Sequence, residues 1–280
     1  MTQAEITTQE FDLFRVLIEQ KVGIKLSPEK RKTLGRKLSR RMRELSLTSY
    51  ASYFRLVKSR DGAAEMARLL GMVTIGQTQF FRGDRQFSLF GEELLPRILA
   101  GKKGGNKRVR LWSAACSNGQ EPYSIAMLVL DKTRHVRDLD MKILATDVDR
   151  DSLRFARAGR YPGSVTAEVP SPYLARYFSA ETGPGREGYR VRDEVRALVT
   201  FRSLNLLEFP YPMAGPMDAV WLRNTMIYFA APAKKAILAE VHRLLSPGGF
   251  LCLGGSESLV GLDDRFSLLS HAVYVKKGSL

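Results

Sequence analysis

The feature that most constrains the fold is an alternation, after residue 105, of short apolar runs with longer amphipathic stretches. The amphipathic stretches, at 121–132, 150–158 and 233–245, have the spacing of helices. The apolar runs have the length of strands and cover residues 109–112, 142–146, 199–204, 219–222, 250–253 and 272–275. Strands that alternate with helices predict a parallel sheet with helices on both faces. The sequence therefore predicts an α/β fold.

Two other stretches of the chain follow different patterns. Before residue 75 the patterns are helical only, at 9–21, 28–45, 49–58 and 63–71. The second helix has a start signal, with Ser27 as N-cap and Pro28 at the first helical position. Residues 160–197 break the rhythm with clustered Pro, Gly and Ser, which indicates short antiparallel strands and turns. We therefore expect a helical domain over 1–75 and a sheet domain over 76–280, with a β-insertion at about 160–200.

Composition excludes several classes of protein. The 280 residues suffice for two domains, and 44% apolar with 26% charged residues is ordinary for a soluble globular protein. The longest apolar runs fall far short of the roughly 18–20 residues that cross a bilayer, and the N-terminus lacks a secretory signal pattern. The two cysteines, Cys116 and Cys252, are too few for a disulfide framework or a metal site built on cysteine pairs. We expect a cytoplasmic protein with no membrane insertion and no metal site.

The net charge of +15 points to an anionic partner without identifying it. Nucleic acid, an anionic membrane and an acidic protein surface all fit a chain as basic as this one. The choice between them depends on the residues at the predicted ligand site.

That site is expected at the carboxyl ends of the strands, where open parallel sheets bind ligands. The run of small residues at 112–119 follows the first strand, and Asp147, which could bond ribose hydroxyls, follows the second. No G-x-G-x-x-G or Walker loop is present, so the phosphates of NAD or ATP are poorly supported. Glu121, at the next helix start, suits a cofactor with a cationic centre and an amino group, such as S-adenosylmethionine. Taken singly, each signal fits equally well an ordinary tight turn, with Asp147 as a helix N-cap.

Six motifs in register carry a resemblance to a known family. They are Trp112-Ser-Ala-Ala-Cys-Ser-Asn-Gly-Gln-Glu-Pro-Tyr-Ser-Ile-Ala-Met127, Thr78-Gln-Phe-Phe-Arg82, Ala145-Thr-Asp147, Asn205-Leu206, Arg223-Asn-Thr-Met-Ile-Tyr-Phe229 and Gly255-Ser-Glu-Ser258. In order and spacing the chain strongly resembles the CheR family, the glutamate O-methyltransferases of chemotaxis receptors, from about residue 10 to residue 276. The resemblance implies a Rossmann-like class I methyltransferase fold, with a small all-α N-terminal domain and an inserted antiparallel β-subdomain. It also implies methyl transfer from S-adenosylmethionine to receptor glutamates, which gives glutamate methyl esters and S-adenosylhomocysteine.

The resemblance also implies roles for individual residues. The implied cofactor contacts are Thr78, Arg82, Glu121, Asp147, Asn205, Leu206, Arg223 and Asn224. Arg82, Arg223 and Tyr228 are implied as the catalytic residues. Arg223 and Tyr228 would face the transferring methyl and the incoming carboxylate, and the two arginines could orient that carboxylate through their planar guanidinium groups.

The chain departs from the family pattern at two positions. Gly76 stands where an asparagine is usual, so a possible side-chain contact with the cofactor is lost. Gln120 replaces the first of two glutamates, but Glu121 matches the one that contacts the cofactor in the family. We expect the first change to weaken cofactor binding and the second to be mild.

A basic helix and the β-insertion are the expected contacts with the receptor. Eight Lys or Arg residues and no acidic residue lie between Lys30 and Arg43. Leu34, Leu38, Met42 and Leu45 form an apolar stripe, and the opposite stripe is Lys32, Arg36, Arg40 and Arg43. Such a run is often just a solvated helix face, but in the family this helix faces the acidic methylation region of the receptor coiled coil. Lys37, Arg40 and Arg43 are thus implied as docking residues, and the insertion, with its loop at 179–189, could bind a tether peptide at the receptor C-terminus.

Two rival functions remain at the level of sequence. A nucleic-acid methyltransferase is suggested by the charge, but the chain lacks the acidic-Pro-Pro-Tyr loop that flips and stacks a base. A non-catalytic protein that binds cofactor or receptor is suggested by Gly76 and Gln120. We expect a monomeric enzyme whose partners are chemotaxis receptors and not nucleic acid.

Overall fold

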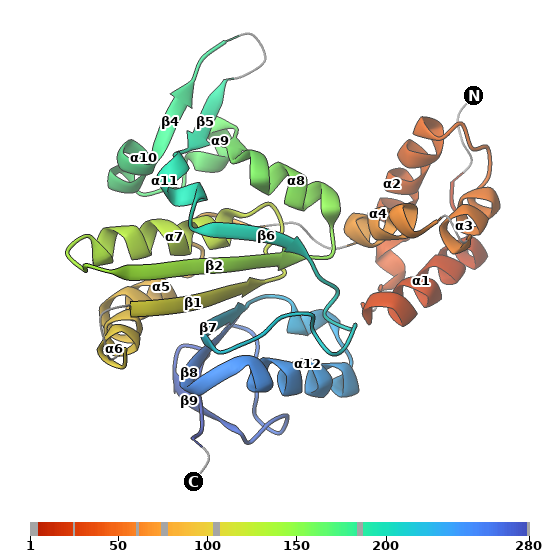
Figure 1. Ribbon diagram of the computed structural model, residues 1–280. Coiled ribbons are helices and arrows are strands. Elements are labelled where there is room, and N and C mark those ends of the chain that lie inside the picture. Colours follow the sequence, from red (N-terminus) through yellow and green to blue (C-terminus); the bar gives the residue numbers. More distant parts are fainter. Residues whose placement is uncertain are drawn as a thin grey trace.

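The computed structural model describes residues 5–24, 26–59, 62–73, 78–102, 107–183 and 187–278. Figure 1 shows a cluster of N-terminal helices beside a central sheet, and a small second sheet near one of the sheet's helical faces. Within the described residues no helix is long and apolar enough to cross a membrane.

The N-terminal part is helical, as predicted. Its helices are α1 (Thr8–Val22), α2 (Arg31–Glu44), α3 (Tyr50–Lys58) and α4 (Ala63–Val73). They enclose a core of their own that includes Phe14, Ile18, Leu38 and Tyr53. The expected boundary near residue 75 lies at 74–77, outside the described residues.

The start of the second helix differs from the prediction. Pro28–Lys30 forms a separate 3-10 turn, η1, ahead of α2. Ser27 occupies the N-cap position of that turn, but its hydroxyl bonds Glu29 Oε2 at 3.3 Å and caps no backbone N–H. A 3-10 turn has a different set of free N–H groups, so the expected Ser27 cap bond does not form.

A seven-stranded sheet organises the rest of the chain. The strands are β1 (Lys107–Ala114), β2 (Leu139–Asp147), β6 (Val199–Ser203), β7 (Met217–Leu222), β8 (Leu245–Leu253), β9 (Phe266–Ser270) and β10 (Val273–Lys276). Their order is β6-β2-β1-β7-β8-β10-β9. The first five run parallel, and β10 is antiparallel to both of its neighbours. The α/β prediction is confirmed, and the chain changes direction across the sheet between β1 and β7, which is where ligands bind in such folds.

Helices cover both faces of this sheet (Figure 1). Helices α7 (Gln120–Thr133) and α8 (Arg150–Ala158) pack on one face, and α12 (Ala231–Leu244) packs on the other. Alternate residues of β7 enter opposite cores, with Trp221 on the α7 side and Val220 on the α12 side. Each of the two sheet faces is therefore buried, as the continuous apolar runs predict.

Some elements had no counterpart in the sequence prediction. The segment between the helical cluster and β1 forms α5 (Asp84–Leu89), a π-helical turn η2 (Phe90–Leu94) and α6 (Leu95–Ala100). The edge strand β9 was also not predicted, because only Phe266 of its five residues is buried.

The β-insertion is confirmed as an antiparallel sheet of β3 (Arg160–Tyr161), β5 (Gly188–Val191) and β4 (Phe178–Glu181), in that order. Three short helices that were not expected accompany it: α9 (Gly163–Thr166), α10 (Ser171–Tyr177) and α11 (Asp193–Arg196). Phe80 joins the insertion to the main sheet domain, because its ring packs edge-on against Tyr161 and Phe178.

Candidate active site

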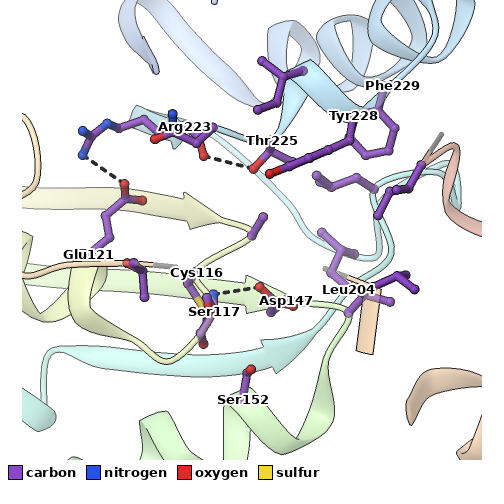
Figure 2. A pocket seen from close by; sticks show the side chains of 18 of the residues that line it. Cys116, Ser117, Glu121, Asp147, Ser152, Leu204, Arg223, Thr225, Tyr228 and Phe229 are labelled. Atoms are coloured by element: carbon purple, nitrogen blue, oxygen red, sulfur yellow. Dashed lines mark hydrogen bonds and ion pairs between the residues drawn. The ribbon is translucent and has the colours of Figure 1, made fainter. Parts of the chain in front are cut away.

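A cavity of about 300 Å³ lies at the carboxyl ends of β1, β2 and β7 (Figure 2). All eight residues expected to contact the cofactor line it, and Tyr228 does so as well. Ile24 and Val73 of the N-terminal helical cluster and Gln79, Ser152 and Phe229 also line it. Sequence reasoning assigned none of these five to the site. Gln79 and Phe229 lie within the recognised motifs, but nothing marks Ile24 and Val73, since an apolar lining residue looks like any core residue.

The loop after β1 lines the cavity with residues 115–117 and has an unusual backbone conformation. Ala115, Ser117 and Gly119 all have positive φ, at 58°, 48° and 87°. At Gly119 a Cβ would lie 2.8 Å from the Cβ of Ala156, so only glycine fits there without a shift. Strained conformations of this kind concentrate at ligand sites, where the surrounding structure maintains them.

Asp147 is held at the end of β2 by backbone N–H groups. Its Oδ2 accepts from Ser117 N at 2.7 Å and its Oδ1 from Asp149 N at 2.8 Å. Burial raises its pKa to about 6, although these two hydrogen bonds favour the ionised form. The N-cap of α8 is Asp149, which accepts from Asp151 N at 2.9 Å. The alternative that Asp147 is merely a helix cap is therefore wrong.

Glu121 and Arg223 form a buried ion pair on the opposite side of the cavity. Glu121 Oε2 lies 3.2 Å from Arg223 Nη1, and Glu121 Oε1 accepts from Ser113 Oγ at 2.7 Å. Burial raises the pKa of Glu121, while the charge of Arg223 lowers it. The Arg223 guanidinium also donates to the carbonyl oxygen of Arg82 and stacks near the Trp221 ring, 5.5 Å from its centroid. Both carboxylate oxygens of Glu121 are therefore bonded within the protein, one by Ser113 and the other by Arg223.

Arg223 and Tyr228 lie on different sides of the site. Figure 2 shows the Arg223 side chain extending toward Glu121 and away from Tyr228. Arg223 is only 9% exposed, whereas Arg82 is exposed. Burial raises the pKa of Tyr228, and the nearby charge of Arg82 lowers it, so Arg82 acts electrostatically on the tyrosine hydroxyl. Arg82 and Tyr228 both line the cavity.

The loop after β6 connects the site to the helical cluster. Asn205 Nδ2 donates to the carbonyl oxygen of Lys21 at 3.1 Å, and Asn205 Oδ1 accepts from Leu207 N at 3.1 Å. Leu206 is buried and belongs to the core that α12 forms with the sheet. The helical cluster thus contacts Asn205, and the α12 core contacts Leu206.

The two departures from the family pattern have different locations. Gln120 is 4% exposed at the start of α7 and does not line the cavity among the described residues. Gly76 lies at 74–77, outside the described residues.

The predicted docking residues lie on α2, away from the cavity. The two faces of this helix are confirmed: Leu34, Leu38 and Met42 are buried, whereas Lys32, Arg36, Arg40 and Arg43 are exposed. The charge is partly compensated by acidic residues beyond the basic run, since Arg41 pairs with Glu65 at 2.7 Å and Arg40 with Glu44 at 3.5 Å. Lys37 donates to the carbonyl oxygen of Met72 at the end of α4, and burial lowers its pKa.

Comparison with known proteins identifies the family. The profile for the CheR methyltransferase all-alpha domain matches residues 9–74, and that for the CheR methyltransferase SAM binding domain matches residues 76–275. A probable chemotaxis protein methyltransferase of Rhizobium etli is 39% identical over 88% of this chain and 91% of that protein. Chemotaxis protein methyltransferase 1 of Pseudomonas aeruginosa is 37% identical, over 93% of this chain and 94% of its own. The chemotaxis protein methyltransferase of Escherichia coli (strain K12) is 38% identical over 92% of this chain and 87% of that protein.

These matches agree with the cavity. The SAM binding domain profile spans every residue of the sheet domain that lines the cavity, so the cofactor is S-adenosylmethionine. The two profiles together cover nearly the whole chain. This chain belongs to the CheR family of methyltransferases.

Proposed function

We propose that this protein transfers a methyl group from S-adenosylmethionine to glutamate side chains of chemotaxis receptors. One observation carries the proposal: the two buried carboxylates that line the cavity, Glu121 and Asp147, already accept hydrogen bonds from the protein. Glu121 accepts from Arg223 and Ser113, and Asp147 accepts from two backbone N–H groups. Neither is placed to act as a general base. An acceptor that needs no base therefore fits best.

A glutamate side chain is such an acceptor. With a reference pKa of about 4.3 it is ionised at neutral pH, so its oxygen can attack without losing a proton first. Bound S-adenosylmethionine supplies a methyl group that is already activated by a sulfonium. The carboxylate oxygen forms a bond to the methyl carbon as the carbon–sulfur bond breaks, and S-adenosylhomocysteine leaves. What the protein must provide is in-line alignment at roughly 3–3.5 Å.

The chain's own residues would divide this task. Asp147 would bind ribose hydroxyls, and Glu121 would bind the amino group of the methionine part. Arg82, an exposed residue at the cavity, would attract and orient the acceptor carboxylate. Tyr228, whose hydroxyl is protonated at neutral pH, would direct the hydroxyl dipole at the reacting methyl. We place Arg223 on the cofactor side, where it holds Glu121, because its guanidinium is buried there.

Receptor docking would use two surfaces remote from the chemistry. The exposed basic face of α2, including Arg40 and Arg43, fits the acidic coiled coil of the receptor by charge. Lys37, which is bound to the end of α4, would contribute less. The outer strand β4 of the insertion could pair with a tether peptide as an added strand.

A transfer assay with radiolabelled cofactor tests the proposal. One tube contains receptor membranes and a second contains RNA. We expect label on the receptor that is released as methanol by mild alkali, as a methyl ester requires. Label on RNA would instead support a nucleic-acid methyltransferase, and cofactor binding without any transfer would support a regulator. Receptor whose candidate glutamates are changed to alanine is the matched control, and it should remain unlabelled.

A further inference from the structure

Glu257 is a buried carboxylate that binds the backbone of the loop carrying Asn224 and Tyr228. Its Oε2 accepts from Asn224 N at 2.8 Å, and its Oε1 accepts from Thr225 N at 2.9 Å and Ile227 N at 3.3 Å. A fourth bond, from Gly254 N to Oε2 at 2.6 Å, connects it to the end of β8. Three of its four donors thus belong to the loop that follows β7.

The charge of Glu257 is satisfied without a cation. The side chain is 7% exposed, and within the described residues it forms no ion pair with Lys, Arg or His. An isolated carboxylate is very costly to bury, so the four N–H dipoles must replace its hydration. Successive backbone N–H groups that converge on one anion form such a cradle. A neutral core side chain could not draw these N–H groups together, because it would leave them without acceptors.

This cradle sets the conformation of the catalytic loop. Asn224 has a φ of 55°, in the left-handed region that most residues avoid, and its N–H points at Glu257. The turn continues into the 3-10 helix η3 (Met226–Tyr228), which places Tyr228 at the cavity. At Gly254 a Cβ would lie 2.8 Å from Glu257 Oε2 and 2.9 Å from Asn224 N, so glycine is needed for this close approach. The ends of β7 and β8 are thereby joined through one carboxylate.

We propose that Glu257 is a positioning residue for methyl transfer. Its carboxylate holds the strained loop so that Asn224 faces the cofactor and Tyr228 faces the reacting methyl. The part that concerns Tyr228 rests on the proposed function. The part that concerns Asn224 needs only cofactor binding and is independent of the acceptor.

The test is Glu257→Gln, which preserves size but turns one acceptor oxygen into an NH₂ donor. We expect turnover to fall about 100-fold, the scale of a misplaced catalytic group. The affinity for S-adenosylhomocysteine should fall about tenfold, as for one lost hydrogen bond to a charged group. The KM for receptor should change little, since the proposed docking surfaces are elsewhere.

Asp218→Asn is the matched control. Asp218 is also 7% exposed and accepts a backbone N–H, from Arg110 at 2.8 Å. It differs in also pairing with Lys102, and it lies at the opposite end of β7 from the cavity. This variant should lower the melting temperature as Glu257→Gln does. Its turnover, measured well below melting, should stay within about twofold of the wild type.

Two results would overturn the inference: a folded Glu257→Gln that turns over and binds product as the wild type does, or equal losses of turnover in Asp218→Asn. Should Glu257→Gln not fold, Glu257→Asp retains the charge on a shorter side chain and takes its place. If neither folds, the carboxylate is a folding determinant and the positioning role is wrong. A wild type that binds product but methylates no receptor would refute the proposed function alone, since product binding by calorimetry requires no acceptor.

Discussion

Asp147 should make cofactor binding depend on pH. Burial raises its pKa to about 6. Ribose hydroxyls donate hydrogen bonds to the ionised carboxylate, so bound cofactor favours that form and lowers the pKa. Binding therefore releases a proton below pH 6 and tightens as the pH rises. The stability of the folded protein changes in the opposite direction. Because the pKa is raised in the folded state, ionising this buried carboxyl lowers the free energy of unfolding as the pH rises from 3.8 to about 6.

The size of the effect follows from this pKa of about 6. At pH 5, one unit below it, about one tenth of Asp147 is ionised. The apparent affinity for S-adenosylhomocysteine should then be about tenfold lower than at pH 7.5, a difference of about 1.4 kcal/mol. Glu121, whose pKa is also raised by burial, contributes a slope of the same sign. The diagnostic quantity is therefore the difference between the wild type and Asp147→Asn, which cannot titrate at this position.

Isothermal titration calorimetry from pH 5 to pH 7.5 is the assay. Two buffers with different ionisation enthalpies reveal the proton that is released. The wild type should lose affinity toward pH 5, and Asp147→Asn should be weaker at pH 7.5 with a flatter profile. Asp147→Ala should weaken binding by about 1–3 kcal/mol at pH 7.5. Identical profiles for the wild type and Asp147→Asn would refute the assignment of Asp147 to the ribose.

Three further variants test other parts of the molecule. Tyr228→Phe should lower turnover and leave product affinity unchanged in calorimetry, because only the hydroxyl aimed at the methyl is lost; an unchanged turnover would contradict its role. Reversing Arg40 and Arg43 to Glu should raise the KM for receptor without changing cofactor binding, and wild-type activity should fall with salt, since charges more than about 10 Å apart are screened near 0.1 M. Full activity of that double variant at low salt would make the stripe an ordinary solvated face. Glu65→Ala removes the carboxylate that pairs with Arg41 at 2.7 Å and accepts from the Tyr53 hydroxyl at 2.8 Å, while Glu44 stays paired with Arg41, so the change should cost about 1–3 kcal/mol in denaturant unfolding; a loss below about 0.5 kcal/mol would show that Glu44 and water replace Glu65.

The sheet could be predicted because its strands are buried on both faces and so appear as unbroken apolar runs. β9 escaped detection because it is an edge strand with Leu268 exposed at 62%, so neither an apolar run nor strict alternation marks it. The helical segment at 84–100 was missed for another reason. It is assembled from α5, a π-helical turn and α6, and no single period of 3.6 residues runs through it.

Site residues could be predicted where chemistry and position in the fold coincide. Asp147 and Glu121 follow adjacent parallel strands, and such strand ends meet at one edge of the sheet. The direction of the Arg223 side chain could not be read from sequence, because it depends on the Trp221 ring and on Glu121 across the cavity. Glu257 was part of a recognised motif, but its role depends on backbone N–H directions that no side-chain pattern encodes.

The helical domain would supply binding energy for the receptor that the cavity of the sheet domain cannot supply alone. A single glutamate side chain offers the cavity little binding energy, and contacts remote from the reacting atoms must supply the rest. Under the proposed function the exposed face of α2 would be such a remote surface, while Ile24 and Val73 from the same domain line the cavity itself. Asn205 connects the two domains by donating to the Lys21 carbonyl. A receptor helix held on α2 would therefore present its glutamates at a high effective concentration. On this reasoning charge reversal on α2 affects KM, whereas changes at Tyr228 or Glu257 affect turnover.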